Sequence, residues 1–243
     1  MLISFVSAKG SPGVTTSVLA LASVWPRTAV VVEADPAGGD VAAGLGRGAW
    51  PAGAGLTDLV VDTRACGADD ALRRRAVRLA PHCPLALAGL GAPQQAAVVP
   101  WERLGNEFRR ITDADVLVDC GRFSPSDGTA ALVASSDGVV VVSGSSLRSV
   151  RATARLVPLL DDRGGHRGLV VVRPDRPYDA VEIAESCGAP LLGTLPDDAR
   201  AAGVWSDGHA AGRWFVRSAL QRTAAALAHV LISGPPAARG AAS

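Results

Sequence analysis

A glycine-rich turn near the N-terminus has the residue types that bind phosphate. It runs from Lys9 to Thr16 as K-G-S-P-G-V-T-T, between an apolar run at residues 2–7 and a helical pattern at residues 15–25. The backbone N–H groups of such a turn and the positive end of the following helix attract an anion. The phosphate-binding pattern G-x-x-x-x-G-K-[ST] has a lysine where this chain has Val14, whereas Thr15 supplies the hydroxyl that holds Mg²⁺.

Three acidic residues follow two other predicted strands. Glu33 and Asp35 follow the apolar run that begins at Thr28, and Asp119 ends the run that begins at Val116. Because the carboxyl ends of parallel strands meet at one edge of a sheet, we expect these carboxylates beside the glycine-rich turn. An acid in that place holds Mg²⁺ against a bound phosphate, directly or through water.

The elements that position these residues alternate along the chain. Short β-branched runs are separated by helix-like segments, which is the pattern of a parallel sheet covered by helices on both faces. Strands are predicted at residues 2–7, 28–33, 85–88, 116–119, 138–143, 169–172 and 191–193. Helices are predicted at residues 15–25, 55–62, 68–80, 94–111, 127–135, 146–160, 178–187, 197–203 and 213–232. We therefore predict an α/β three-layer sandwich with a mostly parallel sheet, as one domain over residues 1–232 with a flexible tail at 233–243.

Composition excludes several classes of protein. The 243 residues are 48% hydrophobic with a formal net charge of +1, which argues against a disordered chain and a constitutive nucleic-acid binder. The four cysteines lack the spacing of a zinc site. The sequence also has no uninterrupted run of eighteen apolar residues, so we expect no integral membrane segment. We expect a cytoplasmic protein. Of the 24 basic residues, Lys9 is the one lysine.

The glycine-rich turn resembles the deviant Walker A motif of the ParA/MinD family of P-loop ATPases, K-G-G-x-G-K-T-T. Five positions match, namely Lys9, Gly10, Gly13, Thr15 and Thr16, whereas Ser11 and Val14 depart from it. Residues 30–36 resemble the family's switch I segment, 116–121 its Walker B strand running into switch II, and 192–197 its L-G-x-I-P-D segment. Residues 55–59 and 87–89 are similar to the branch that includes MinD-like and pilus-assembly localisation proteins.

This resemblance implies ATP and Mg²⁺ as cofactors and assigns roles to single residues. Lys9 would reach the phosphates of the partner in a homodimer, and Asp35 would position the attacking water, which makes these two the implied catalytic residues. The metal would be held by Thr15, Asp35 and Asp119. The nucleotide would be bound by Gly10, Ser11, Gly13, Val14, Thr15, Thr16 and Gly121, with the Gly121 N–H approaching the terminal phosphate.

Two departures from the family pattern bear on activity. Val14 stands in place of the second lysine, and Arg173 stands where the family places an asparagine that reads adenine. Losing a charged phosphate contact costs about 1.5–3 kcal/mol, and more in the transition state. We therefore expect weak or absent ATP hydrolysis.

The resemblance favours an ATP-dependent dimer switch that positions or partitions a protein partner in a localisation, division, pilus or secretion system. One alternative is a non-enzymatic scaffold that has lost nucleotide. Another is a DNA-partition ATPase that uses Arg148, Arg151 and Arg155, although a solvated helix face is the preferred interpretation of these residues. A plain strand-to-helix turn capped by threonine also accounts for the turn taken alone. A dinucleotide-binding turn is rejected because G-x-G-x-x-G would need glycine at Pro12 and Thr15.

Overall fold

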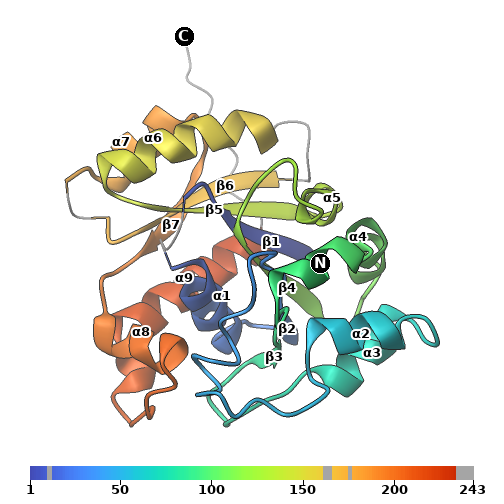
Figure 1. Cartoon of the computed structure of the whole chain (residues 1–243). Coiled ribbons are helices and arrows are strands. Elements are labelled where there is room, and N and C mark those ends of the chain that lie inside the picture. The colour runs from blue at the N-terminus through green and yellow to red at the C-terminus, as the bar shows by residue number, and fades with distance from the viewer. Residues whose placement is uncertain (10–12, 161–165, 175–176, 234–243) are drawn as a thin grey trace.

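A computed structural model describes residues 1–9, 13–160, 166–174 and 177–233 of the chain (Figure 1). Seven strands form one sheet in the order β3-β2-β4-β1-β5-β6-β7, and each neighbouring pair is parallel. The strands are β1 (Leu2–Ser7), β2 (Ala29–Glu33), β3 (Leu85–Leu87), β4 (Asp115–Arg122), β5 (Gly138–Gly144), β6 (His166–Val172) and β7 (Leu191–Leu195). The predicted α/β sandwich is thus confirmed, with a strand at each of the seven predicted places.

Helices cover both faces of this sheet. They are α1 (Val14–Ser23), α2 (Leu56–Asp62), α3 (Ala68–Arg75), α4 (Trp101–Arg109), α5 (Thr129–Ala134), α6 (Leu147–Leu156), α7 (Ala180–Cys187), α8 (Ala199–Ser206) and α9 (Ala219–Ser233). Short 3₁₀ turns are η1 (Pro93–Val98), η2 (Val157–Leu160) and η3 (Phe215–Arg217). No helix in these described segments is both long enough and apolar enough to cross a bilayer.

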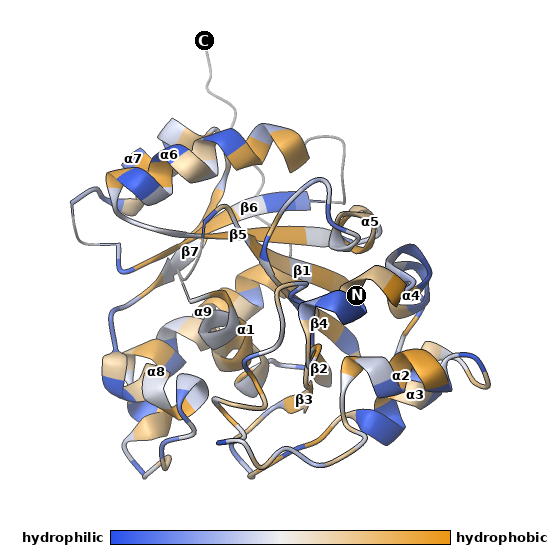
Figure 2. Cartoon of the chain, viewed as in Figure 1, coloured by the Kyte–Doolittle hydropathy of each residue, from blue (hydrophilic) through white to orange (hydrophobic). Residues whose placement is uncertain are grey.

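Two hydrophobic clusters separate the three layers. Alternate residues of each strand point to opposite faces, so Val116 and Val118 of β4 join the cluster under α2 to α7, whereas Leu117 joins the cluster under α1, α8 and α9. Burial of the strands on both faces explains their almost continuous apolar sequence. Figure 2 shows this as mainly orange strands inside helices that carry blue positions.

Several helix boundaries differ from the predicted ones for local reasons. The segment predicted at 94–111 divides into η1 and α4, with Pro100 as the residue before α4, because proline is favoured at a helix start and not in its interior. Helix α3 ends at Arg75, and Val77 instead pairs with Ala86 as an isolated antiparallel bridge. The final segment divides into η3 and α9, which extends to Ser233, and the tail predicted at 233–243 otherwise lies outside the described residues.

Candidate functional site

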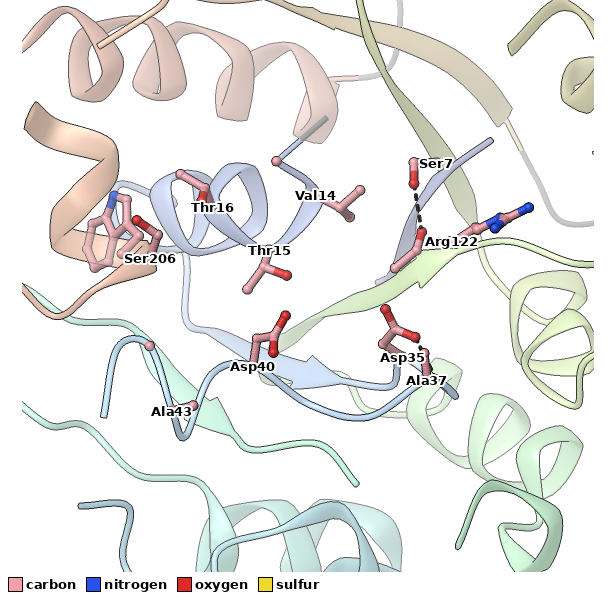
Figure 3. Close-up of a pocket in the computed structure, with 14 residues that line it drawn as sticks. Ser7, Val14, Thr15, Thr16, Asp35, Ala37, Asp40, Ala43, Arg122 and Ser206 are labelled. Atoms are coloured by element: carbon pink, nitrogen blue, oxygen red, sulfur yellow. Dashed lines mark hydrogen bonds between the residues drawn. The ribbon is translucent and has the colours of Figure 1, made fainter. Parts of the chain in front are cut away.

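A large cavity lies where the predicted chemistry was expected, at the carboxyl ends of β1, β2 and β4. This cavity of about 770 Å³ is lined by the first turn of α1, the loop after β2, the end of β4 and the end of α8. Open parallel sheets bind ligands at this edge, where neighbouring connections leave in opposite directions. Figure 3 shows the side chains of Thr15 and Asp40 pointing toward one another, with Asp35 to one side of them.

Six predicted site residues come together in this lining. They are Gly13, Val14, Thr15 and Thr16 around the start of α1, Asp35 after β2, and Gly121 in β4. Gly13 precedes α1 in a left-handed conformation, with φ of 90°, which turns the chain into the helix. Lys9 is exposed just after β1 and is not part of this lining, and Gly10 and Ser11 lie outside the described residues.

Asp119 lies next to residues that line the cavity, and one of its oxygens has no partner in the described part of the chain. It is 1% exposed, its Oδ1 accepts a hydrogen bond from the Gly121 N–H at 3.0 Å, and no donor in the described segments makes a hydrogen bond to its Oδ2. Burial raises the pKa of Asp119 to about 6, opposed by the nearby Thr15 hydroxyl and the Gly121 N–H and reinforced by Asp35 and Asp40. A buried, unpartnered carboxylate oxygen beside a threonine hydroxyl fits Mg²⁺, which prefers oxygen ligands and keeps several waters.

Asp35 and Gly121 depend on each other sterically. The Asp35 Oδ1 accepts a hydrogen bond from the Ala37 N–H at 2.8 Å, and burial raises its pKa, with Asp40 and Asp127 adding to the rise. Gly121 has φ of 58°, and a Cβ there would overlap the Asp35 carboxylate. The glycine therefore allows β4 to pass directly against Asp35. Its N–H now serves Asp119, so a phosphate contact through that N–H requires this hydrogen bond to be released.

Glu33 organises the loop that forms one wall of the cavity. It is 1% exposed and accepts hydrogen bonds from the N–H groups of Asp40 at 2.6 Å, Val41 at 2.9 Å and Gly89 at 2.7 Å. Burial, with the nearby charge of Asp119, raises its pKa to about 7 against these three bonds. Glu33 thus ties the loop after β2 to the loop after β3, a role that its place in the sequence did not reveal.

Sequence reasoning missed the other residues of the lining, among them two charged residues and the end of a distant helix. Asp40 comes from the loop after β2, Arg122 ends β4, and Trp205 and Ser206 end α8. Trp205 is 1% exposed and packs edge-on against Phe215, with ring centroids 5.3 Å apart. These residues lie far apart in the sequence and follow no motif. The one available signal was the direct succession of Arg122 after Gly121.

Comparison with known proteins finds likeness in structure and none in sequence families. A scan with models of protein families gives no match, and neither does a search of curated proteins. The septum site-determining protein MinD from Pyrococcus horikoshii, complexed with Mg-ADP, is 19% identical with a TM-score of 0.75, over 96% of this chain and 97% of that one. This chain has the ParA/MinD fold.

Two further ParA/MinD structures agree. A ParA family ATPase from Chlorobium tepidum is 19% identical with a TM-score of 0.70, over 95% of this chain and 98% of that one. MinD in the MinC:MinD cell division complex from Aquifex aeolicus is 17% identical with a TM-score of 0.61, over 97% of this chain and 96% of that one. The coverage shows that the ParA/MinD fold extends over nearly all of the chain.

A second, smaller cavity adjoins the first in this ParA/MinD fold. It measures about 220 Å³, shares Gly13 and Thr16 with the first cavity, and is also lined by Arg173 and Asp197. Arg173 has φ of 56°, a left-handed conformation that is uncommon for arginine, and its N–H donates to the Leu195 carbonyl at 2.8 Å. Exposed Arg173 therefore stands at the position where the resemblance predicted an asparagine, and exposed Asp197 lines the same cavity.

Proposed function

We propose that the protein is an ATP-dependent dimer switch with weak or absent ATP hydrolysis, which positions a protein partner in the cytoplasm. The observation that carries the proposal is the Oδ2 of buried Asp119, which has no hydrogen-bond partner among the described residues and lies close to a large cavity. A buried carboxylate without a counter-charge is unfavourable, so its retention beside Thr15 is best explained by a cation that arrives with a ligand. The ParA/MinD fold and the glycine-rich turn support a nucleotide as that ligand.

In this proposal each side chain of the site has a defined task. Thr15 and Asp119 would hold Mg²⁺, with Asp35 nearby, and the first turn of α1 would direct its N–H groups at the phosphates. When bound, Mg²⁺ would neutralise phosphate charge. Asp35 would orient the attacking water, and Glu33 would keep the loop that carries Asp35 and Asp40 in place.

The presence of Val14 in place of a lysine would make ATP hydrolysis slow. Its side chain is 6% exposed and packs in the cluster under α1, so it offers no positive charge to a phosphate. Charge that builds on the terminal phosphate during hydrolysis is then poorly stabilised. A switch whose output is dimerisation tolerates this, because binding of the nucleotide and its chemistry are separate steps.

Dimerisation would bring exposed Lys9 of one protomer to the phosphates of the other. The resemblance supports this role, and the exposure of Lys9 outside its own cavity is compatible with it. The resulting dimer would present a surface to a partner in a localisation, division, pilus or secretion system. A partner of MinD named MinC is present in one of the similar structures.

The proposal is tested by size-exclusion chromatography with light scattering and by isothermal titration calorimetry, each with and without Mg²⁺ and ATP. We expect Mg²⁺-dependent heat of binding and a shift from monomer to dimer. Lys9→Ala should keep the heat and lose the dimer. A protein that stays monomeric under both conditions and shows no heat of binding would contradict the proposed dimer switch.

A scaffold without nucleotide is the second candidate, and the apolar burial of Val14 favours it. The two candidates separate on Val14→Lys, which restores the missing charge at the cavity. If the site is a degenerate nucleotide site, this change should increase ATP affinity and ATPase activity. Unchanged absence of ATP binding in both Val14→Lys and the wild type would support the scaffold.

A further inference from the structure

The charges around the large cavity are strongly unbalanced. Asp35 and Asp40 line it and Asp119 lies close to it, whereas Arg122 is the one basic residue among the described residues of the lining. A nucleotide triphosphate adds several negative charges to this edge of the sheet. Mg²⁺ and the positive end of α1 offset only part of them, and within one protomer Val14 supplies no further positive charge, so a second cation from the same chain would favour binding before any dimer forms.

A bulge at the end of β4 turns Arg122 to the cavity. Phe5 of β1 pairs with Asp119, and Ser7 pairs with Arg122, so β1 advances by two residues while β4 advances by three. The extra residue coincides with Gly121 and its φ of 58°. Glycine in the left-handed conformation is typical of a bulge, and bulges redirect the side chains that follow them.

Regular alternation would send Arg122 to the other face. Val116, Val118 and Cys120 all point into the cluster under α2 to α7, and an unbroken strand would add the even-numbered Arg122 to that side. With the bulge, Arg122 instead lines the same cavity as Val14 and Thr15. The local backbone thus places Arg122 at the rim of the site at the expense of regular pairing.

The guanidinium of Arg122 is available for a ligand. The residue is exposed, and its side chain makes no hydrogen bond or ion pair with any part of the chain that the structure describes. Figure 3 shows it at the rim beside Ser7, directed away from Thr15. Arginine has a long side chain and a planar fork of donors that matches phosphate oxygens, so rotation about its side-chain bonds is enough to turn it inward.

We propose that Arg122 binds the terminal phosphate of the nucleotide and supplies, from the end of β4, the positive charge that Val14 does not supply from α1. This inference rests on the proposed function. In this proposal the inner phosphates lie against the first turn of α1. Arg122 comes from the end of β4, next to Gly121 and Asp35, and would therefore contact the terminal phosphate. Contact with the terminal phosphate makes Arg122 sensitive to the difference between ATP and ADP.

The test is calorimetric titration of Mg²⁺ with ATP and with ADP into the wild type, Arg122→Ala, Arg122→Lys and Arg148→Ala. Arg148 is a matched control, because it is also exposed and its side chain has no ion pair in the described residues. Arg122→Ala should lose about 10- to 100-fold in ATP affinity, the range for a hydrogen bond to a charged group, with little change for ADP. The ATP affinity of Arg122→Lys should lie between those of the wild type and Arg122→Ala, and the ATP affinity of Arg148→Ala should equal that of the wild type.

Each other outcome is decisive. If the wild type binds ATP and Arg122→Ala binds it equally well, or loses ATP and ADP affinity alike, the inference is wrong and the proposed function stands. If the wild type binds neither nucleotide, both fail. Thermal unfolding of Arg122→Ala should match the wild type, and Arg122→Lys provides the same comparison should the alanine variant be unstable.

Discussion

Strand β4 buries two aspartates, one at its start and one toward its carboxyl end, and their surroundings are opposite in kind. Asp115 begins the strand at 4% exposure, and Asp119 lies four residues later at 1% exposure. The Asp115 Oδ2 accepts hydrogen bonds from Trp25 Nε1 at 2.8 Å and Arg27 Nε at 2.9 Å, and the Met1 amino group lies 3.1 Å from Oδ1. Asp119 has a neutral backbone donor on one oxygen and, within residues 1–9, 13–160, 166–174 and 177–233, none on the other.

This contrast indicates that Asp115 stabilises the fold, whereas Asp119 is placed to bind a ligand. A buried carboxylate is tolerable when cations and donors surround it, as they surround Asp115. Asp119 instead has other carboxylates nearby, and they raise its pKa further. Its environment is unfavourable for the empty protein and favourable for a bound cation, which is the electrostatic pattern of a functional site.

The largest expected effect on stability separates the two aspartates directly. Asp115→Asn should lower the free energy of unfolding by about 3 kcal/mol, because it weakens the charge-assisted bonds to Trp25 and Arg27 and removes the charge that faces the Met1 amino group. Asp119→Asn should change the free energy of unfolding little, because two effects offset one another. The cost of burying an ionised carboxylate disappears, but an amide N–H₂ group is left without a partner. Urea unfolding of both variants without Mg²⁺ measures this. Equal losses would remove the distinction between the two ends.

Gly121 sharpens the comparison at the cavity end of β4. Gly121→Ala should cost about 2 kcal/mol or more, because it combines left-handed strain with overlap of the Asp35 carboxylate. Gly188→Ala is the matched control, since Gly188 has φ of 65° and no atom within 4 Å of an added Cβ. It should show the strain alone, about 1 kcal/mol. Similar losses in thermal unfolding would argue against close packing of Gly121 on Asp35.

The pH dependence of stability carries a smaller signal from Asp119. Its pKa is raised to about 6 in the folded protein, so the folded state holds the proton more tightly than the unfolded chain. Stability from this group is therefore present below about pH 4 and lost as the pH rises through about 6. Between about pH 8 and pH 5 the wild type should gain about 1 kcal/mol more than Asp119→Asn. Identical pH profiles of the two proteins, measured without Mg²⁺, would contradict the raised pKa.

The smallest effect is expected at Arg27, on the other end of β4. Its side chain is 52% exposed although it pairs with Asp115 at 2.7 Å. Solvent and salt screen such a pair, so Arg27→Gln should cost less than about 1 kcal/mol and less still at high salt. A loss as large as that of Asp115→Asn would mean that Arg27 alone satisfies the buried carboxylate.

Much of this architecture was predictable from sequence, because its causes are local. Continuous β-branched runs such as residues 30–32, between helical segments, are typical of a parallel sheet buried on both faces, and the strand ends then bring Asp35 and Asp119 to the glycine-rich turn. Helix interruptions were predictable in part, since Pro100 stands at the start of α4. The split before α9 has no comparable signal.

The rest of the site depends on contacts between distant segments. The bulge that turns Arg122 to the cavity is a matter of register between β1 and β4, which single-sequence patterns do not specify. Glu33 was placed as an acid of the switch I segment, yet it holds backbone N–H groups of two loops. Trp205 reaches the cavity only because α8 packs beside α1, more than 180 residues earlier in the chain.

The most direct test of the account is calorimetric titration of ATP into the wild type, Asp119→Asn and Asp115→Asn, with and without Mg²⁺. We predict that the wild type binds ATP with Mg²⁺, that Asp119→Asn loses about 100-fold in affinity, and that Asp115→Asn retains it under conditions where it is folded. Removing Mg²⁺ should weaken the wild type and leave Asp119→Asn almost unchanged. Equal Mg²⁺-dependent binding by the wild type and Asp119→Asn, or no binding by the wild type, would contradict the claim that the unpartnered oxygen of Asp119 marks a Mg²⁺-nucleotide site.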